Sequence, residues 1–235
     1  MKSDFTQLGA NRFVVAAMII ALLSGAAFVR NTVWINNISI WEDTVTKSFA
    51  KERGHYNLGN IYQTLGLTEQ AIEQYQLALS LKPSVQAHTN LAIIYNRSGS
   101  TDREISHLKA ALEMTPGAAE LYNDLGIAYR KKGMPKKAIE HFKIALNLNP
   151  SYSETYNNLG NEYAQMGLMN DAKEYFITAL KLNPEYAEAC YNLGVLHERT
   201  GSVDKAIEYY QKTLIITPNF TEAQNRRSAL VFRHT

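Results

Sequence analysis

Hydrophobic and polar positions repeat every 34 residues along most of this chain, with one step of 33. Each repeat contains a leucine followed by a small residue, at Leu58-Gly59, Leu91-Ala92, Leu125-Gly126, Leu159-Gly160 and Leu193-Gly194. With few exceptions, an aromatic residue, a glycine, an alanine, a second aromatic residue, a leucine and a proline then follow in the same order. Apolar residues three and four positions apart share one helix face, so each unit predicts two amphipathic helices.

Each recurring residue has a physical role in such a helix–turn–helix unit. The small residue lets the second helix approach the first closely, and the later glycine ends the first helix because it adopts a left-handed conformation cheaply. The proline ends the second helix because it lacks an N–H and clashes with the preceding turn. One unit cannot bury its apolar stripe alone, so stacked neighbours must supply the core. We therefore predict an all-α solenoid.

Four residues depart from the repeat. Glu104 and Leu108 replace the expected alanine and aromatic residue in the second unit, and His197 and Thr213 are the exceptions in the fifth. All four stand at positions that pack between helices elsewhere in the series. We expect locally looser packing at these places within the same fold.

These motifs resemble the tetratricopeptide repeat, and the resemblance implies a right-handed superhelical solenoid. The five repeats are expected at 52–84, 85–118, 119–152, 153–186 and 187–218, about seven-tenths of the chain. Before them, residues 30–51 predict a linker and a half-repeat that caps the first full unit. After them, residues 219–235 predict a capping helix, because an open stack needs terminal units with a polar outer face.

The segment before the repeats predicts membrane attachment. After an N-terminal tail over 1–12, residues 13–29 form a run without charge between Arg12 and Arg30. A helix of this length spans about 25 Å, at the short end of what crosses a bilayer. An uncleaved anchor and a cleaved signal peptide both fit, since Ser24-Gly25-Ala26 offers small residues for cleavage. We favour the anchor because the apolar run continues beyond that point.

Basic residues around this segment favour one orientation. Lys2 and Arg12 precede the run, whereas Arg30 follows it closely and Lys47 stands further away. The positive-inside rule then places the N-terminus in the cytoplasm and the repeats on the extracytoplasmic side, periplasmic or lumenal. The formal net charge of +2 gives no reason to expect nucleic acid as a partner.

In tetratricopeptide arrays the first helices line a concave groove, so the resemblance implies an extended polypeptide as the partner. A ladder of mostly asparagines at one position also resembles the array of the O-linked N-acetylglucosamine transferase. An amide side chain both donates and accepts hydrogen bonds, so it can pair with any peptide backbone; equally, the ladder can pack helix against helix. The predicted groove residues are Tyr56, Asn57, Asn60, Asn90, Asn123, Asp124, Asn157, Asn158, Asn161, Tyr191 and Asn192.

Two further features bear on the choice of partner. The positions that would form a basic clamp for a chaperone's C-terminal carboxylate hold Tyr56, Gln86, Glu120 and Asp124, which excludes that class of partner. The densest positive charge lies around the turn of the third unit, which is either a solvated turn or a docking patch for anionic lipid. Its residues are Arg130, Lys131, Lys132, Lys136 and Lys137.

The sequence shows no pattern typical of catalysis. It has no glycine-rich phosphate loop or nucleophile motif, its six histidines are dispersed, and its single cysteine, Cys190, matches no metal or redox spacing. His55 and His88 occupy a position that tyrosines fill in other units, which indicates packing. We therefore expect a protein that is not an enzyme, with no cofactor, metal or small-molecule substrate.

A second resemblance concerns the junction before the repeats. Arg30-Asn31-Thr32-Val33-Trp34 and Ile40-Trp41-Glu42-Asp43-Thr44-Val45 look like the junction in membrane glycosyltransferases related to protein O-mannosyltransferases. There, a last transmembrane helix leads into repeats. This resemblance implies an alternative role, as an accessory or substrate-presenting repeat domain of such a transferase system.

Overall fold

The computed structural model describes residues 38–45, 47 and 51–234. The tail predicted at 1–12, the transmembrane segment at 13–29 and the start of the 30–51 linker lie outside the described residues. None of the helices in the described ranges combines the length and the apolar character needed to cross a bilayer. Anchoring through residues 13–29 therefore stays a prediction.

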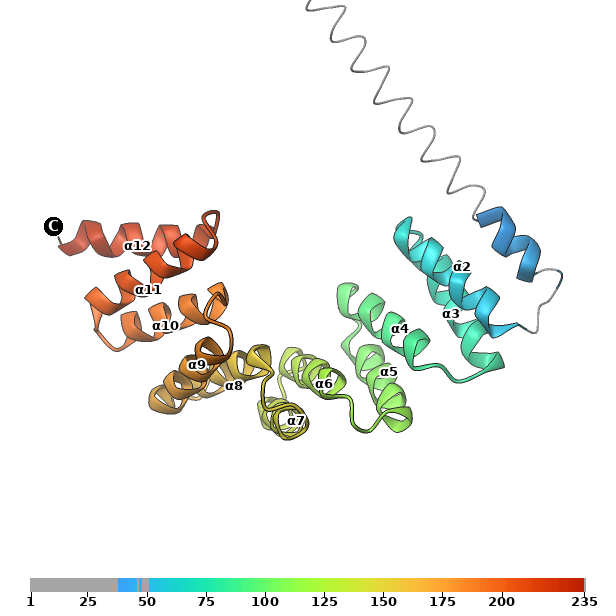
Figure 1. Ribbon diagram of the computed structural model, residues 1–235, viewed down its shortest axis with the longest axis horizontal. Coiled ribbons are helices and arrows are strands. Elements are labelled where there is room, and N and C mark those ends of the chain that lie inside the picture. Colours follow the sequence, from blue (N-terminus) through green and yellow to red (C-terminus); the bar gives the residue numbers. More distant parts are fainter. Residues whose placement is uncertain (1–37, 46, 48–50, 235) are drawn as a thin grey trace, which may run out of the picture. The chain divides into compact units, whose positions relative to one another are not determined.

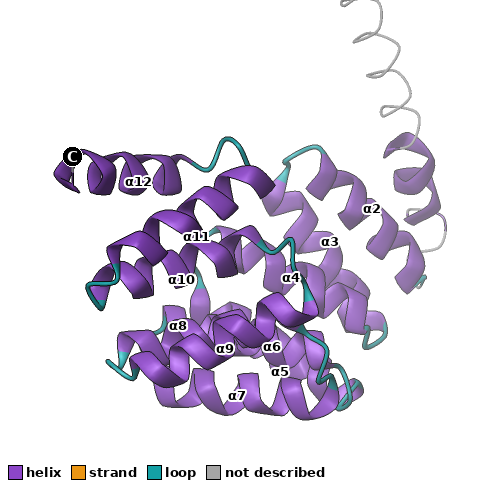
Figure 2. Ribbon diagram, turned by 60° about the vertical axis from the view of Figure 1, so that its left-hand side comes forward, coloured by secondary structure: helices purple, strands orange, loops and turns teal. Residues whose placement is uncertain are grey.

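The described residues are helical throughout apart from their short connections, and they include no strand (Figure 1, Figure 2). A short helical segment covers 38–45 and 47. The long helices are α2 (Glu52–Thr64), α3 (Thr68–Leu81), α4 (Val85–Arg97), α5 (Thr101–Met114), α6 (Ala119–Lys131), α7 (Pro135–Leu148), α8 (Ser153–Gln165), α9 (Met169–Leu182), α10 (Ala187–Arg199), α11 (Val203–Ile216) and α12 (Thr221–His234). The predicted all-α fold of consecutive helices is therefore confirmed for the described residues.

Glycine makes the tight turn inside each pair of helices, as the sequence predicts. Gly66, Gly99, Gly133, Gly167 and Gly201 have φ angles of 76°, 73°, 72°, 80° and 76°, in the left-handed region. A residue with a Cβ is strained there, so glycine ends each first helix at low cost.

Contacts between residues divide the chain into two units, Met1–Ala87 and His88–Thr235. In the N-terminal unit, the helical segment over 38–45 and 47 packs on α2. The hydroxyl of Tyr62 donates a hydrogen bond to Glu42 Oε1 at 2.9 Å, and a Cβ on Gly54 would lie 3.0 Å from Val45 Cγ1. Residues Glu42 and Val45 of the junction thus contact α2, the first helix of the first full repeat.

The C-terminal unit is organised by close contacts between a glycine and an aromatic ring. A Cβ on Gly126 would lie 2.5 Å from Phe142 Cε1, a separation that real side chains do not adopt. The same contact recurs between α8 and α9 at Gly160 and Phe176, and between α10 and α11 at Gly194 and Tyr210. Each ring is almost fully buried against the backbone of the first helix, so the pair can hold its ring only where the first helix has no side chain.

In the second repeat, formed by α4 and α5, a different pair of residues packs between the two helices. Ala92 and Leu108 are 3% and 2% exposed and stand where the other pairs have a glycine and a ring. A methyl group has been added on one helix and an aromatic ring exchanged for a smaller side chain on the other. The helical pair remains intact, because a core tolerates apolar exchanges that keep its total volume approximately the same.

Looser packing, expected at His197 and Thr213, is not found there. His197 is 5% exposed and stacks on Tyr209 with ring centroids 5.5 Å apart. Equivalent ring pairs are Tyr95–His107, Tyr129–His141 and Tyr163–Tyr175. The fifth repeat therefore exchanges the order of histidine and tyrosine and keeps the stack. Thr213 is fully buried, and its hydroxyl is satisfied because it donates a hydrogen bond to the Tyr209 carbonyl at 3.0 Å.

Gly126→Ala should destabilise the protein by about 1–3 kcal/mol, because the new methyl group collides with the Phe142 ring and this outweighs the gain in helix propensity. Adding Phe142→Leu reproduces the Ala92–Leu108 pair and should recover part of the loss. Urea unfolding of the two single variants and the double variant measures the coupling.

Gly117→Ala is the control for this series, since a Cβ on Gly117 meets no atom within 4 Å. It should leave the unfolding midpoint nearly unchanged. Strictly additive effects of Gly126→Ala and Phe142→Leu would show that the glycine–ring contact is not the constraint.

Candidate functional site

Side-chain hydrogen bonds join the first helices of successive pairs in the C-terminal unit. Asn158 on α8 donates through Nδ2 to Asn123 Oδ1 on α6 at 3.1 Å, and Thr155 Oγ1 donates to the same oxygen at 3.0 Å. One repeat later, Asn192 on α10 donates to Asn157 Oδ1 on α8 at 2.9 Å. The surface formed by α4, α6, α8 and α10, here called the first-helix face, thus has two bonded pairs of asparagines, Asn123 with Asn158 and Asn157 with Asn192.

The carbonyl end of Asn158 is also in use. Arg130 Nη1 donates to Asn158 Oδ1 at 3.1 Å, and Arg130 Nε lies 3.8 Å from Glu162 Oε1. Glu162 is 1% exposed; burial raises the pKa of its carboxyl group, and the Arg130 charge opposes that shift. Asn123, Asn157 and Asn158 are buried as well, at 0%, 5% and 6% exposure. These three asparagines have the bonded partners that a packing role requires, and their contact with a peptide stays a prediction.

The remaining predicted groove residues of the C-terminal unit are half-buried. Asn90, Asp124, Asn161 and Asn192 expose part of their side chains on the first-helix face. The hydroxyl of Tyr191 accepts a hydrogen bond from Arg226 Nε on α12 at 3.1 Å. Its ring stacks on the Phe220 ring, with the two ring centroids 5.0 Å apart. Tyr191 is thus in contact with the residues that begin and form the C-terminal helix, and the contact of these positions with a peptide stays a prediction.

The N-terminal unit carries the other three predicted groove residues. Tyr56, Asn57 and Asn60 lie half-buried on α2. The Tyr56 ring lies 5.9 Å from the Tyr75 ring, and the Tyr75 hydroxyl donates to Gln63 Oε1 at 2.6 Å while lying 2.7 Å from Asn60 Oδ1. Asn60 thus contacts the second helix of its own pair.

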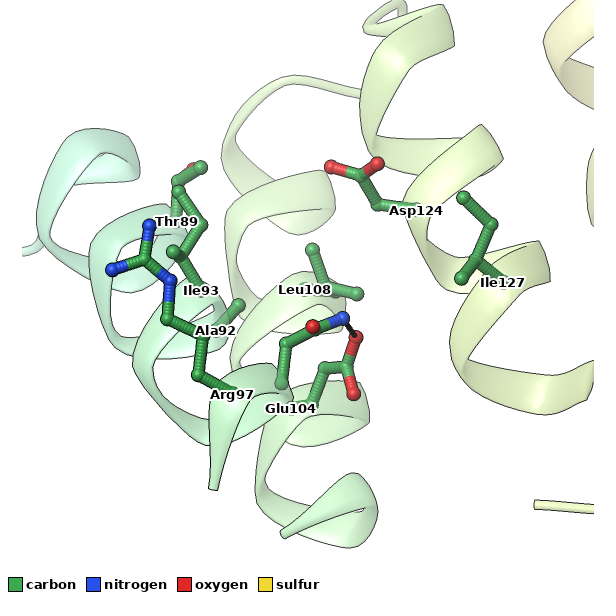
Figure 3. Close-up of a pocket in the computed structure, with 9 residues that line it drawn as sticks. Thr89, Ala92, Ile93, Arg97, Glu104, Leu108, Asp124 and Ile127 are labelled. Carbon is green, nitrogen blue, oxygen red and sulfur yellow. Dashed lines mark hydrogen bonds between the residues drawn. The ribbon is translucent and has the colours of Figure 1, made fainter. Parts of the chain in front are cut away.

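A cavity of about 210 Å³ opens on the first-helix face between α4, α5 and α6 (Figure 3). Its apolar wall includes Ile93, Leu108 and Ile127, and its polar wall includes Glu104 and Asp124. A cavity of about 110 Å³ lies between α8, α9 and α10, lined by residues such as Asn161, Phe176, Asn192 and Val195.

The two cavities occupy equivalent positions two repeats apart. Ile93, Leu108, Asp124 and Ile127 in the first correspond, 68 residues later, to Asn161, Phe176, Asn192 and Val195 in the second. The first cavity is larger, in keeping with a leucine standing where the second has an aromatic ring. The solenoid therefore repeats a small niche between consecutive first helices and varies its lining.

The larger cavity has an acidic wall. Glu104 is 3% exposed; its Oε1 accepts a hydrogen bond from Asn96 Nδ2 at 2.6 Å, and its buried Oε2 has no hydrogen-bond partner among the described residues. Burial, together with the neighbouring charges of Glu154, Glu104 and Glu120, raises the pKa of Asp124 to about 6, although a hydrogen bond with Asn123 acts in the opposite direction. In the sequence, the only signal for Glu104 is that it stands where the other repeats have alanine.

Three of the five basic residues around the turn of the third repeat have partners within the protein. Arg130 contacts the next repeat, Lys132 pairs with Asp102, and Lys137 Nζ lies 5.3 Å above the Tyr129 ring. Lys131 and Lys136 are exposed. Docking of this turn to anionic lipid stays a prediction.

The described residues offer little chemistry beyond this face. No group of three or more histidine, cysteine or acidic side chains in this part of the chain is placed to hold a metal ion. Cys190 is buried, and burial raises the pKa of its thiol. His88 and His107 approach through their Nδ1 atoms at 2.9 Å, and burial lowers the pKa of both rings.

Comparison with known proteins agrees with the repeat pattern. Family models described as tetratricopeptide repeat match residues 52–84, 119–152 and 157–219, together more than half of the chain. No curated protein matches this chain. These matches do not bear on the resemblance to O-mannosyltransferase-like enzymes, which stays a prediction.

Several solved structures share the fold. The MamA protein is 26% identical, covering 73% of this chain and 94% of its own, with a TM-score of 0.63. YrrB, described as a tetratricopeptide-repeat protein with an unusual peptide-binding site, is 22% identical over 80% of this chain and 97% of its own, with a TM-score of 0.63. PilF of Pseudomonas aeruginosa is 16% identical, covering 87% and 94%, with a TM-score of 0.69.

Asp124→Asn should stabilise the protein at neutral pH and not in acid. Because the folded-state pKa of Asp124 is raised from 3.8 to about 6, the folded state loses stability as pH rises through that window, and the cost persists above it. The amide cannot ionise, so at about pH 7.5 the variant should be more stable by up to about 3 kcal/mol. Near pH 4 the two proteins should unfold at similar urea concentrations.

Asp204→Asn, at an exposed position on α11, controls for the loss of one negative charge. A stability difference for Asp124→Asn that is the same at both pH values would contradict the raised pKa.

Proposed function

This chain belongs to the tetratricopeptide-repeat family, and we propose that it is a membrane-anchored scaffold. It binds an extended segment of a partner polypeptide along the first-helix face and so assembles or recruits a protein complex. The observation that carries this proposal is the recurrence of one niche between α4 and α6 and again between α8 and α10. Niches at equivalent places along a solenoid suit a ligand that runs along it, as an extended chain does.

The lining of these niches fits polypeptide better than a small molecule. Each is open to solvent and small, at about 210 and 110 Å³, whereas pockets for drug-sized ligands measure roughly 300–1,000 Å³. Asn161 and Asn192 offer half-buried amides beside the apolar side chain of Val195. Such a surface can pair with backbone groups and accept one side chain at a time.

The bonded asparagines contribute to this function indirectly. Asn123, Asn157 and Asn158 hold α6, α8 and α10 in register through hydrogen bonds across the repeats. A face that is ordered before binding loses less conformational entropy when a ligand arrives. We assign peptide contact to the half-buried positions and the positioning of the first helices to the buried ones.

The anchor and its orientation are part of the same proposal. The uncharged run over 13–29 would hold the repeats at the membrane, with the repeat domain on the extracytoplasmic side. Binding, assembly and recruitment need no catalytic group, and the protein acts without a cofactor. The alternative role beside an O-mannosyltransferase-like enzyme is supported by the motifs over 30–45.

Replacing Asn161 and Asn192 together by alanine should weaken binding of the partner segment by about 1–3 kcal/mol, or roughly 5- to 150-fold. Both amides line the niche between α8 and α10, and Asn192 also donates to Asn157, so the variant must keep its melting temperature before the loss of affinity is assigned to the niche. The matched control replaces Asn147 and Asn170, two exposed asparagines on second helices, which should leave affinity unchanged.

A photo-crosslinking residue identifies the partner and tests the face. Placed at Ile93, 39% exposed on α4, it should capture a polypeptide in cells; placed at Leu148, 45% exposed on α7, it should not. Capture must also fall when Asn161 and Asn192 are alanine. Equal capture from both sites would reject the first-helix face, and capture of a polytopic transferase would favour the alternative role.

Residues 13–29 should remain in the mature protein, because the uncharged run continues beyond the possible cleavage site at Ser24-Gly25-Ala26. Mass spectrometry of protein expressed with its native start gives the N-terminus. A chain that begins at Ala27 and washes off membranes would show that the segment is a signal peptide.

A further inference from the structure

One position in the second repeat differs in chemistry from all its equivalents. Ala71, Ala138, Ala172 and Ala206 occupy this place in the other repeats, and each is fully buried. The second repeat has Glu104 there, also buried at 3% exposure. A buried carboxyl group costs stability unless it is paired, so its presence at a place where alanine packs well calls for a partner.

Space for such a partner lies beside Glu104. In the third and fourth repeats an aromatic ring covers a glycine of the first helix, whereas the second repeat has Leu108 over Ala92. The cavity bounded by these residues measures about 210 Å³, against about 110 Å³ at the equivalent place two repeats later. Carboxyl group and cavity thus occur in the same repeat.

The polar groups around the cavity leave one carboxyl oxygen without a hydrogen bond. Asn96 occupies Oε1 of Glu104, and Oε2 is enclosed without a hydrogen-bond partner among the described residues. Asp124 lies on the facing helix, and Glu104 is one of the charges that disfavour its ionisation. Figure 3 shows the Arg97 guanidinium on the Thr89 side of the cavity, and no ion pair within the described ranges joins it to either carboxyl group.

We propose that this cavity binds the side chain of a lysine in the partner polypeptide, with the ammonium group between Glu104 and Asp124. The inference rests on the proposed function, because the lysine belongs to the segment that runs along the first-helix face. Its four-carbon stem packs on Ile93, Leu108 and Ile127, which form the apolar wall. The terminal torsion of a glutamate is soft, so a small rotation turns an oxygen of Glu104 toward the ammonium.

The available acceptors favour lysine over arginine. A guanidinium group pairs best with both oxygens of one carboxylate, and one oxygen of Glu104 is already bonded to Asn96. An ammonium group is a compact charge with three donors on a flexible stem, so it can contact one oxygen on each of two carboxylates. Asp124, with a pKa of about 6, is ionised at neutral pH and supplies the second acceptor.

The test uses the full-length chain and four libraries of end-blocked nonapeptides with random flanking residues. The central residue is lysine, arginine, norleucine or glutamate, and norleucine keeps the stem without the ammonium group. Fluorescence anisotropy at neutral pH and low salt should show the lysine library binding at least about tenfold more tightly than the norleucine library. The arginine library should fall between them.

Two variants locate the preference. Glu104→Ala installs the residue of the other four repeats, so it should melt at or above the temperature of the unmodified protein while the lysine preference disappears. Ala92→Gly with Leu108→Phe rebuilds the glycine–ring contact of the third repeat, closes the cavity and should have the same effect. Ser106→Ala, exposed on α5, should leave the preference in place.

The outcomes separate this inference from the function on which it rests. If the lysine and norleucine libraries bind equally, or if the preference survives Glu104→Ala, the lysine site is rejected while peptide binding stands. If the arginine library binds most tightly, the assignment of lysine is wrong. If no library binds at all, the proposed peptide-binding function itself is rejected.

Discussion

The close approach of two helices within four of the five repeats depends on the absence of a side chain at one place, which the second repeat fills with Ala92. In the third, fourth and fifth repeats a buried ring lies where a Cβ on the first helix would be, at 2.5 to 2.6 Å. Because a close-packed interior cannot absorb such an overlap, the glycine and the ring are set together. The turn glycines and the stacked rings accompany this contact, and the second repeat keeps both without it.

The second repeat shows what changes when this constraint is met differently. Ala92 and Leu108 preserve the pair of helices but fill less of the space beside them, and the repeat contains the larger cavity. A leucine cannot cover the surface that a phenylalanine ring covers, so the adjoining position becomes able to hold a longer side chain. Glu104 occupies that position, so the repeat with the different packing also has a buried carboxyl group.

The sequence was a good guide to the fold and a weaker guide to the candidate site. Helix pairs and turns could be predicted because glycine, proline and apolar spacing act locally. The fate of the asparagines could not: Asn57 and Asn158 share one repeat position, yet Asn158 is bonded to both Asn123 and Arg130. Such bonds depend on residues about one repeat apart, and periodicity alone does not say whether an amide faces a neighbour or solvent.

Selectivity in a protein of this kind depends on where its repeats differ from one another. Amides that pair with backbone groups are tolerant of partner sequence, so a face made only of regular repeats would discriminate little. A buried carboxyl group with an unused oxygen discriminates more strongly, because a cation or a hydrogen-bond donor relieves its cost and an apolar side chain does not. Glu104 introduces that group at one point along a repeating surface. In the proposed function, the regular repeats would provide general affinity for an extended chain, and the irregular one would fix which residue of that chain lies opposite it.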